Sequence, residues 1–140
     1  MKLKIKKLDP QAKLPQFALV GDVGMDIFSN ENLLIKPGER VFCKTGIAME
    51  FETDYTALIW DKGGMAFNGI KTMGGVFEGT YHGEYLIGLV NLGQIDFEVK
   101  QGQKIAQVLF QKVERPQIEE VAELSESSRG EGRFGSTGKF

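Results

Sequence analysis

The chain has 140 residues, of which 41% are hydrophobic and 26% charged, enough for one domain with its own hydrophobic core. Its net charge of −2 excludes a general attraction for nucleic acid, and no apolar run approaches the roughly 20 residues of a membrane-spanning helix. Cys43 is the single cysteine, which excludes an internal disulfide and a zinc site built from cysteines. Because the basic N-terminus also lacks the apolar core of a signal peptide, a reducing cytoplasm is the expected location.

Short strands are expected along the first half of the chain. Residues 2–8 alternate basic and aliphatic side chains with the period of a half-exposed strand, and residues 21–28 alternate small or acidic with apolar ones. The segment between them contains Pro15 and should be irregular. Turn residues such as Lys36-Pro37-Gly38-Glu39 separate further expected strands at 33–35, 40–44, 47–51 and 55–60.

Residues 71–84 form the most distinctive stretch of the sequence. Residues 73–77 and 85–90 have the composition of strands, and Gly79 lies where a hairpin joining them would reverse. We therefore expect these two strands to pair with each other.

This stretch also carries candidate chemical groups. Gly74 and Gly75 would let a flat ligand or another backbone approach closely. Glu78 is a possible base and Tyr81 a possible stacking platform. A bend with a solvated acid and a core tyrosine is the structural alternative. His82 is the only histidine, so no Ser-His or Cys-His pair is indicated.

The last strands are expected at 96–100 and 104–112, which makes the fold all-β, a sandwich or jelly roll. Gln107 and Asp26 are polar residues inside apolar strands, and buried polar groups need partners. We expect residues 1–124 to form one β domain. Residues 125–140 are polar and rich in glycine and serine, and should form a flexible C-terminal arm.

Two segments have the residues of a phosphate site. In the arm, alternating glycines expose amides that can surround an anion, and the segment adds side-chain donors from Arg129, Arg133, Ser136 and Thr137. Phe134 lies among these glycines, where stacking on a base suits it better than a core would; a flexible linker is the alternative. Lys62-Gly63-Gly64 offers a cation beside bare amides. No cluster of residues has metal-ligand spacing.

Taken in order, five segments resemble the motifs of the trimeric deoxyuridine triphosphatase (dUTPase) family. They are Gly24-Met25-Asp26, Lys62-Gly63-Gly64-Met65-Ala66, and residues 75–84, 102–107 and 129–138. The resemblance implies a distorted jelly-roll β-barrel that forms homotrimers, with active sites drawing on all three subunits. It also implies hydrolysis of dUTP to dUMP and pyrophosphate by attack of water on the α-phosphorus, with Mg²⁺ held mainly by the triphosphate and no protein metal site.

The resemblance also assigns roles to residues. Glu78 would occupy the position of the water-activating aspartate, with Asp26 as a second catalytic residue, and Tyr81 would pack under the sugar and exclude a 2′-hydroxyl. The other substrate-binding residues would be Lys62, Gly63, Gly64, Thr72, Gly75, Val76, Leu86, Gln107, Arg129, Phe134, Gly135, Ser136 and Thr137. The expected partners are thus the nucleotide and further copies of the chain, with no nucleic acid and no membrane.

The sequence departs from the family pattern at several of these positions. Lys62-Gly63 stands where Arg-Ser is usual, Glu78 replaces the usual Asp, His82 stands where Arg is common, and Arg133 stands where Gly is usual. A non-catalytic or weakly active nucleotide-binding regulator on the same scaffold is therefore the alternative function. A dCTP deaminase is disfavoured, because residues 63–67 lack the serines and the arginine of that relative.

Overall fold

The structure, a computed structural model, describes residues 1–133. Short strands dominate this part of the chain, with one helical turn between them. The elements are β1 (Lys4–Lys7), β2 (Met25–Phe28), β3 (Leu33–Ile35), β4 (Arg40–Cys43), β5 (Ile47–Glu50), β6 (Tyr55–Asp61), α1 (Gly63–Phe67), β7 (Ile70–Thr72), β8 (Val76–Glu78), β9 (Ile87–Asn91), β10 (Phe97–Val99) and β11 (Lys104–Lys112). The expected all-β class is confirmed.

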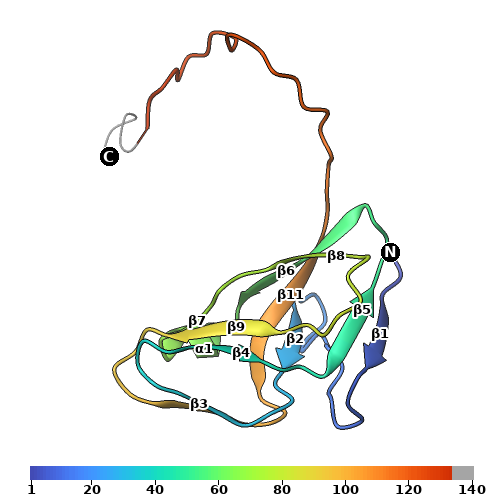
Figure 1. The fold of residues 1–140 in the computed structure, drawn as a ribbon, viewed down its shortest axis with the longest axis vertical. Coiled ribbons are helices and arrows are strands. Elements are labelled where there is room, and N and C mark those ends of the chain that lie inside the picture. The colour runs from blue at the N-terminus through green and yellow to red at the C-terminus, as the bar shows by residue number, and fades with distance from the viewer. Residues whose placement is uncertain (134–140) are drawn as a thin grey trace.

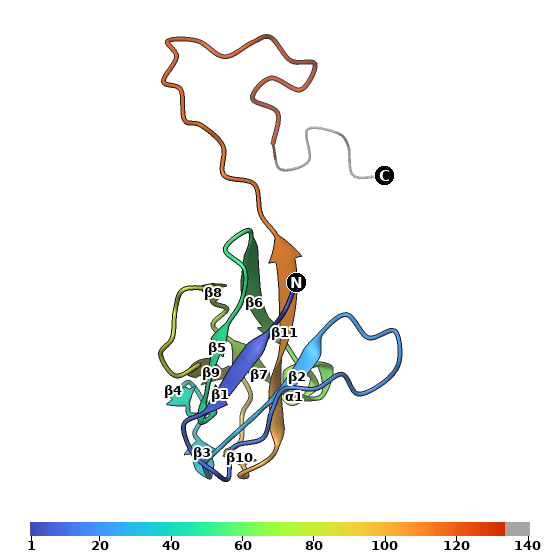
Figure 2. The same cartoon turned by 90° about the vertical axis from the view of Figure 1, so that its right-hand side faces the viewer.

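The strands form small antiparallel sheets around a shared core (Figure 1). The largest has the order β2-β11-β6-β8, and a second has the order β4-β9-β7; β1 pairs with β5, and β10 with β3. β11 and β6 are the inner strands of the large sheet: β11 pairs with β2 and β6, and β6 with β11 and β8. Beyond β11 the chain leaves the sheets as an extended, largely exposed segment that leads into the C-terminal arm (Figure 2).

The core draws one or two fully buried side chains from most strands. Ile27, Leu89 and Ile105 have no solvent exposure, and Tyr85 stacks on Phe77 with ring centroids 4.2 Å apart. Cys43 is likewise buried in β4. Removing this apolar surface from water is the main stabilising contribution to the fold.

The hairpin expected between residues 73–77 and 85–90 is wrong. β8 pairs with β6, while β9 pairs with β4 and β7, so the two segments belong to different sheets. The residues between them form a longer loop, in which the Tyr81 N–H donates to the Glu78 carbonyl over 3.0 Å. Gly79 passes so close to the residue after β5 that an added Cβ would lie 2.2 Å from the Phe51 carbonyl oxygen. This close approach directs the chain away from a tight reversal.

Candidate active site

A β-bulge in β11 organises one end of the large sheet. Lys104 lies opposite Phe28 and Gln107 opposite Asp26, so β11 uses one residue more than β2 between these two pairs. Residues three apart in a regular strand point to opposite faces, but the extra residue re-aims the chain. Lys104, Gln107 and Asp26 consequently share one face of the sheet.

Asp26 carries a buried carboxylate between two lysines. Its side chain is 1% exposed, and its two oxygens lie 2.8 Å from Lys62 Nζ and 2.6 Å from Lys104 Nζ. Burial raises the pKa of this carboxyl, but the adjacent ammonium groups of Lys104 and Lys62 outweigh it and hold the pKa below its ordinary value. Asp26 is therefore ionised at neutral pH, and the three residues together carry one net positive charge.

The backbone beside this cluster is open on one side and tight on the other. An alanine Cβ at Gly63 or Gly64 would meet nothing within 4 Å, so their amides are accessible to a ligand. At Gly24, in contrast, a Cβ would lie 3.3 Å from Gln107 Cβ. The glycine before Met25-Asp26 thus allows β2 and β11 to approach closely next to Gln107. The Gln107 side chain forms no hydrogen bond within residues 1–133 and remains available.

The second group of expected site residues lies around the loop after β8. Glu78 is exposed at the end of β8, and Tyr81, 42% exposed, packs its ring 5.8 Å from Phe77 and 6.0 Å from Tyr85. The Tyr81 hydroxyl donates to the Glu84 carbonyl over 3.2 Å. This aromatic support fixes an exposed ring face close in sequence to the carboxylate.

Four other expected substrate-binding residues lie in or directly before β7, β8 and β9: Thr72, Gly75, Val76 and Leu86. The Thr72 N–H and hydroxyl both donate to Asp61 Oδ1, over 2.8 and 2.7 Å, which ties β7 to the residue before Lys62. Gly75 has a positive φ of 147° and accepts a hydrogen bond from the Ile59 N–H. Val76 and Leu86 are exposed.

The residues expected to bind phosphate, at Lys62–Gly64, lie far from the expected base, Glu78, within one protomer. Glu78 lies opposite Thr56, and Lys62 follows Thr56 by six residues along β6 and just past its end. At a rise of about 3.3 Å per residue, Lys62 and Glu78 are separated by roughly 20 Å. Asp26, Lys62, Gly63, Gly64 and Gln107 are thus brought together, whereas Glu78 and Tyr81 lie at the other end of β6.

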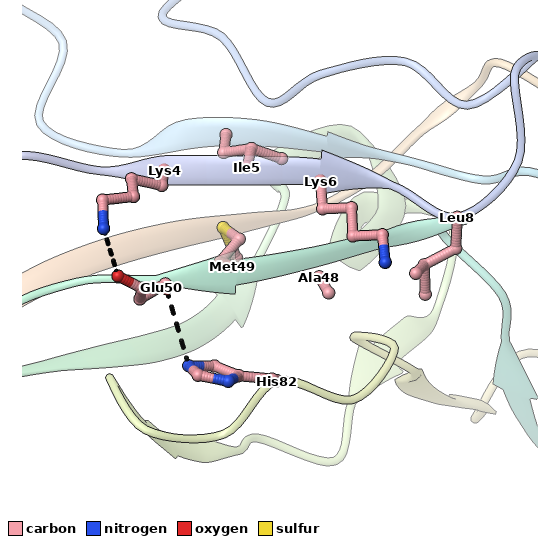
Figure 3. Close-up of a pocket in the computed structure, with 8 residues that line it drawn as sticks. All are labelled: Lys4, Ile5, Lys6, Leu8, Ala48, Met49, Glu50 and His82. Carbon is pink, nitrogen blue, oxygen red and sulfur yellow. Dashed lines mark hydrogen bonds and ion pairs between the residues drawn. The ribbon is translucent and has the colours of Figure 1, made fainter.

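A hollow of about 330 Å³ lies over β1 and β5. One of its lining residues, His82, follows Tyr81 in the chain, but the lining includes neither the Asp26–Lys62–Lys104 cluster nor Glu78 and Tyr81. Figure 3 shows Glu50 between Lys4 and His82 at one side of the hollow. Glu50 pairs with Lys4 and lies 3.9 Å from His82 Nε2. These groups are exposed to solvent, so the ion pairs contribute little to stability. None of the expected catalytic or substrate-binding residues lines this hollow.

Only residues 125–133 of the arm lie within the described structure. Arg129 is exposed, and its carbonyl accepts a hydrogen bond from the Gly132 N–H over 3.0 Å. Phe134, Gly135, Ser136 and Thr137 lie outside the described residues. In the part of the chain that is described, no group of three His, Cys, Asp or Glu side chains is placed to hold a metal ion, and no helix is long and apolar enough to cross a bilayer.

Lys104 is the one residue of this region that sequence reasoning missed. Residues 102–107 contain a cation three positions before Gln107, a spacing that predicts opposite faces in a regular strand. The bulge overturns that expectation, and a bulge depends on the register with β2 rather than on local residue types.

Cations beside open glycine backbone suit a phosphate chain, and an exposed carboxylate near a supported aromatic ring suits hydrolysis of a nucleotide. On an all-β fold, the combination suits a nucleotide phosphohydrolase. The family model described as dUTPase matches residues 10–138. The chain therefore belongs to the dUTPase family.

Individual relatives agree with the family assignment. The chain is 45% identical over 140 residues to the deoxyuridine 5′-triphosphate nucleotidohydrolase of Clostridium tetani, covering 98% of this chain and 97% of that protein. A Staphylococcus bacteriophage 80alpha dUTPase (G164S mutant, with dUpNHpp) superposes with a TM-score of 0.93 at 25% identity, covering 98% of both chains. A dUTPase mutant of phage phi11, described with a structural Mg(II) ion, superposes with a TM-score of 0.82 at 22% identity over 88% of this chain and 98% of that one.

Proposed function

We propose that this protein is a dUTP diphosphatase that hydrolyses dUTP to dUMP and pyrophosphate in the cytoplasm. The observation that carries this proposal is the match to the dUTPase family over residues 10–138, which includes all five motif segments. The relative from Clostridium tetani, similar over nearly the full length of both chains, is named for this reaction.

Glu78 is the proposed base. Its carboxylate would accept a proton from a water molecule as the water oxygen forms a bond to the α-phosphorus. The bond from the α-phosphorus to the oxygen that bridges to the β-phosphorus would break, and pyrophosphate would leave. The exposure of Glu78 at the end of β8 leaves its carboxylate accessible to such a water.

The active site would be assembled from several subunits of a homotrimer. The roughly 20 Å along β6 between Glu78 and Lys62 is too far for both to contact reacting atoms of one nucleotide. A neighbouring copy that places its own Lys62 end near Glu78 would close this gap. This separation is the structural argument for assembly, and oligomeric symmetry makes each contact recur at every site.

The phosphate chain would bind at the cluster of Lys62, Gly63, Gly64 and Gln107, with Arg129 added from the arm. Mg²⁺ would enter with the triphosphate and neutralise part of its charge. The chemistry of the cluster supports this arrangement, because both oxygens of its only carboxylate, Asp26, already contact ammonium groups and leave no ready ligand for the ion.

The uracil would lie against Thr72, Gly75, Val76 and Leu86, and the sugar against the ring of Tyr81. The aromatic packing that holds Tyr81 would make it a fixed surface with no space for a 2′-hydroxyl. The arm, residues 125–140, would then close over the bound nucleotide with Phe134, Gly135, Ser136 and Thr137. Such closure excludes water and completes the site.

Replacing Glu78 with glutamine tests the proposed base. We expect Glu78→Gln to lower kcat for dUTP by at least about 100-fold, the usual contribution of a general base, with affinity for dUpNHpp changed by less than about 3-fold. Glu98→Gln is the matched control, because Glu98 is an exposed strand carboxylate in β10. An active Glu78→Gln enzyme would remove Glu78 from the mechanism.

A second candidate function is a nucleotide-binding regulator without turnover, favoured by Lys62-Gly63 and Glu78 at positions where the family usually has other residues. Pyrophosphate release from dUTP, dCTP, dTTP and UTP by the unmodified protein separates the two. Release from dUTP supports the diphosphatase, whereas tight dUTP binding without release would establish the regulator.

A further inference from the structure

We propose that Lys104 is a second phosphate-binding cation of the dUTP site, and that Asp26 is a positioning residue that holds Lys104 and Lys62 side by side. This inference rests on the proposed function and adds a residue to the site. Its starting point is the three-residue cluster at the end of the large sheet, in which one carboxylate serves two ammonium groups.

The cluster keeps both lysines partly accessible while burying the acid. The side chains of Lys62 and Lys104 are 26% and 38% exposed, compared with 1% for Asp26. Each ammonium group has three donors and can direct the remaining ones outward after contacting Asp26. A buried anion beneath two accessible cations, with net charge of one positive unit, is an arrangement that attracts an anion from solution.

Asp26 also sets the spacing of the two cations. Lys62 contacts Oδ1 and Lys104 contacts Oδ2, so each ammonium group has its own oxygen. Free lysines on flexible four-carbon stems would repel each other and spread apart. The carboxylate therefore holds a cation pair that is ready for a ligand with several anionic oxygens, such as a di- or triphosphate.

The bulge in β11 places this pair of lysines next to the other residues proposed to bind phosphate. It brings Lys104 onto the face of Gln107 and Asp26, and Lys62 is followed directly by the open glycines 63 and 64. Bulges often re-aim a side chain near a functional site.

Binding of inorganic pyrophosphate, followed by calorimetry, tests the role of Lys104 without turnover. We expect Lys104→Met to weaken pyrophosphate binding about tenfold and to raise KM for dUTP by a similar factor, the effect of one lost charge-assisted hydrogen bond. The kcat should change by less than about 3-fold, since the contact would be made equally in the ground and transition states. Lys104→Arg should restore binding.

Lys100→Met is the matched control, because Lys100 is an exposed lysine near β11 that pairs with the exposed Glu98 and does not contact Asp26. It should leave both measurements unchanged. If Lys104→Met binds pyrophosphate as well as Lys100→Met does, the proposed role of Lys104 is wrong, even if the unmodified protein hydrolyses dUTP. If the unmodified protein binds pyrophosphate through Lys104 but releases none from dUTP, the cation pair stands and the proposed reaction fails.

Asp26→Asn separates positioning from net charge. Removing a negative charge next to two cations should tighten anion binding if charge alone matters. If Asp26 positions the lysines, pyrophosphate binding should weaken by several-fold instead, as in Lys104→Met. Tighter binding by a folded Asp26→Asn protein would overturn the positioning role, and the Lys104 variants decide the cation's role if Asp26→Asn does not fold.

Discussion

Replacing Gly83 with alanine tests whether Tyr81 must be held in place for the nucleotide. The new Cβ would lie 2.4 Å from the Tyr81 hydroxyl and 2.5 Å from its Cζ, whereas ordinary contact begins at 3.4 Å. The ring must therefore retreat by about 1 Å, a displacement that can cost on the order of 100-fold in rate when it occurs at a reacting substrate.

The fold should tolerate this change much better than the site. The three atoms nearest to the new Cβ all belong to Tyr81, and this residue is 42% exposed, so its ring can move into solvent. Weakened ring contacts with Phe77 and Tyr85 would cost about 1 kcal/mol of unfolding free energy. We therefore expect kcat/KM for dUTP to fall by about 10–100-fold, with a reduced preference for dUTP over UTP.

Steady-state kinetics with dUTP and UTP, together with urea denaturation, measure these effects. Tyr81→Phe is the control, because it removes the hydroxyl that donates to Glu84 and keeps the ring. It should retain kcat/KM to within about 3-fold, the loss of one exposed neutral hydrogen bond. A Gly83→Ala enzyme with unchanged kcat/KM and unchanged dUTP preference would refute the proposed role of Tyr81.

Two further predictions concern buried polar groups. The Tyr85 hydroxyl is buried and has no hydrogen-bond partner among the described residues, so Tyr85→Phe should leave the urea midpoint unchanged or raise stability by about 1 kcal/mol; a loss above that value would reveal a hidden partner. Burial raises the pKa of Asp26, but contacts with Lys104 and Lys62 lower it below the ordinary 3.8. Burial likewise raises the pKa of Asp61, and contacts with Lys71 and Thr72 lower it below 3.8. The folded protein should therefore lose stability as the pH falls below 3.8 and through these lowered values, and Asp26→Asn should flatten the loss measured by urea midpoints across that range.

Local sequence patterns predicted strand positions well but not strand partners. The strands at residues 33–35 and 104–112 have the predicted bounds, since turn residues bracket apolar runs at both places. β7 was missed although it is no shorter than β3, because it runs directly into the segment from Met73 that was assigned to the expected hairpin. The pairing of β8 with β6 was also missed; it depends on tertiary contacts such as the hydrogen bond from the Thr56 hydroxyl to the Phe77 carbonyl.

The candidate site shows the same division. The motif residues Asp26, Lys62 and Gln107 were selected from the sequence, and the structure brings them together. The sequence did not indicate that Lys104 joins them, because a bulge reverses the face that simple alternation predicts. It also did not indicate that Glu78 and Lys62 lie at opposite ends of one strand, since that distance follows from the register between β6 and β8.

The length of β6 has a genetic consequence. If each reaction centre takes Glu78 from one subunit and the Lys62 cluster from another, two inactive alleles can complement each other. In the proposed homotrimer, a mixture of Glu78-defective and Lys62-defective chains would contain some centres in which both intact groups meet. Trimers built only from chains that are defective at both positions would contain no such centre.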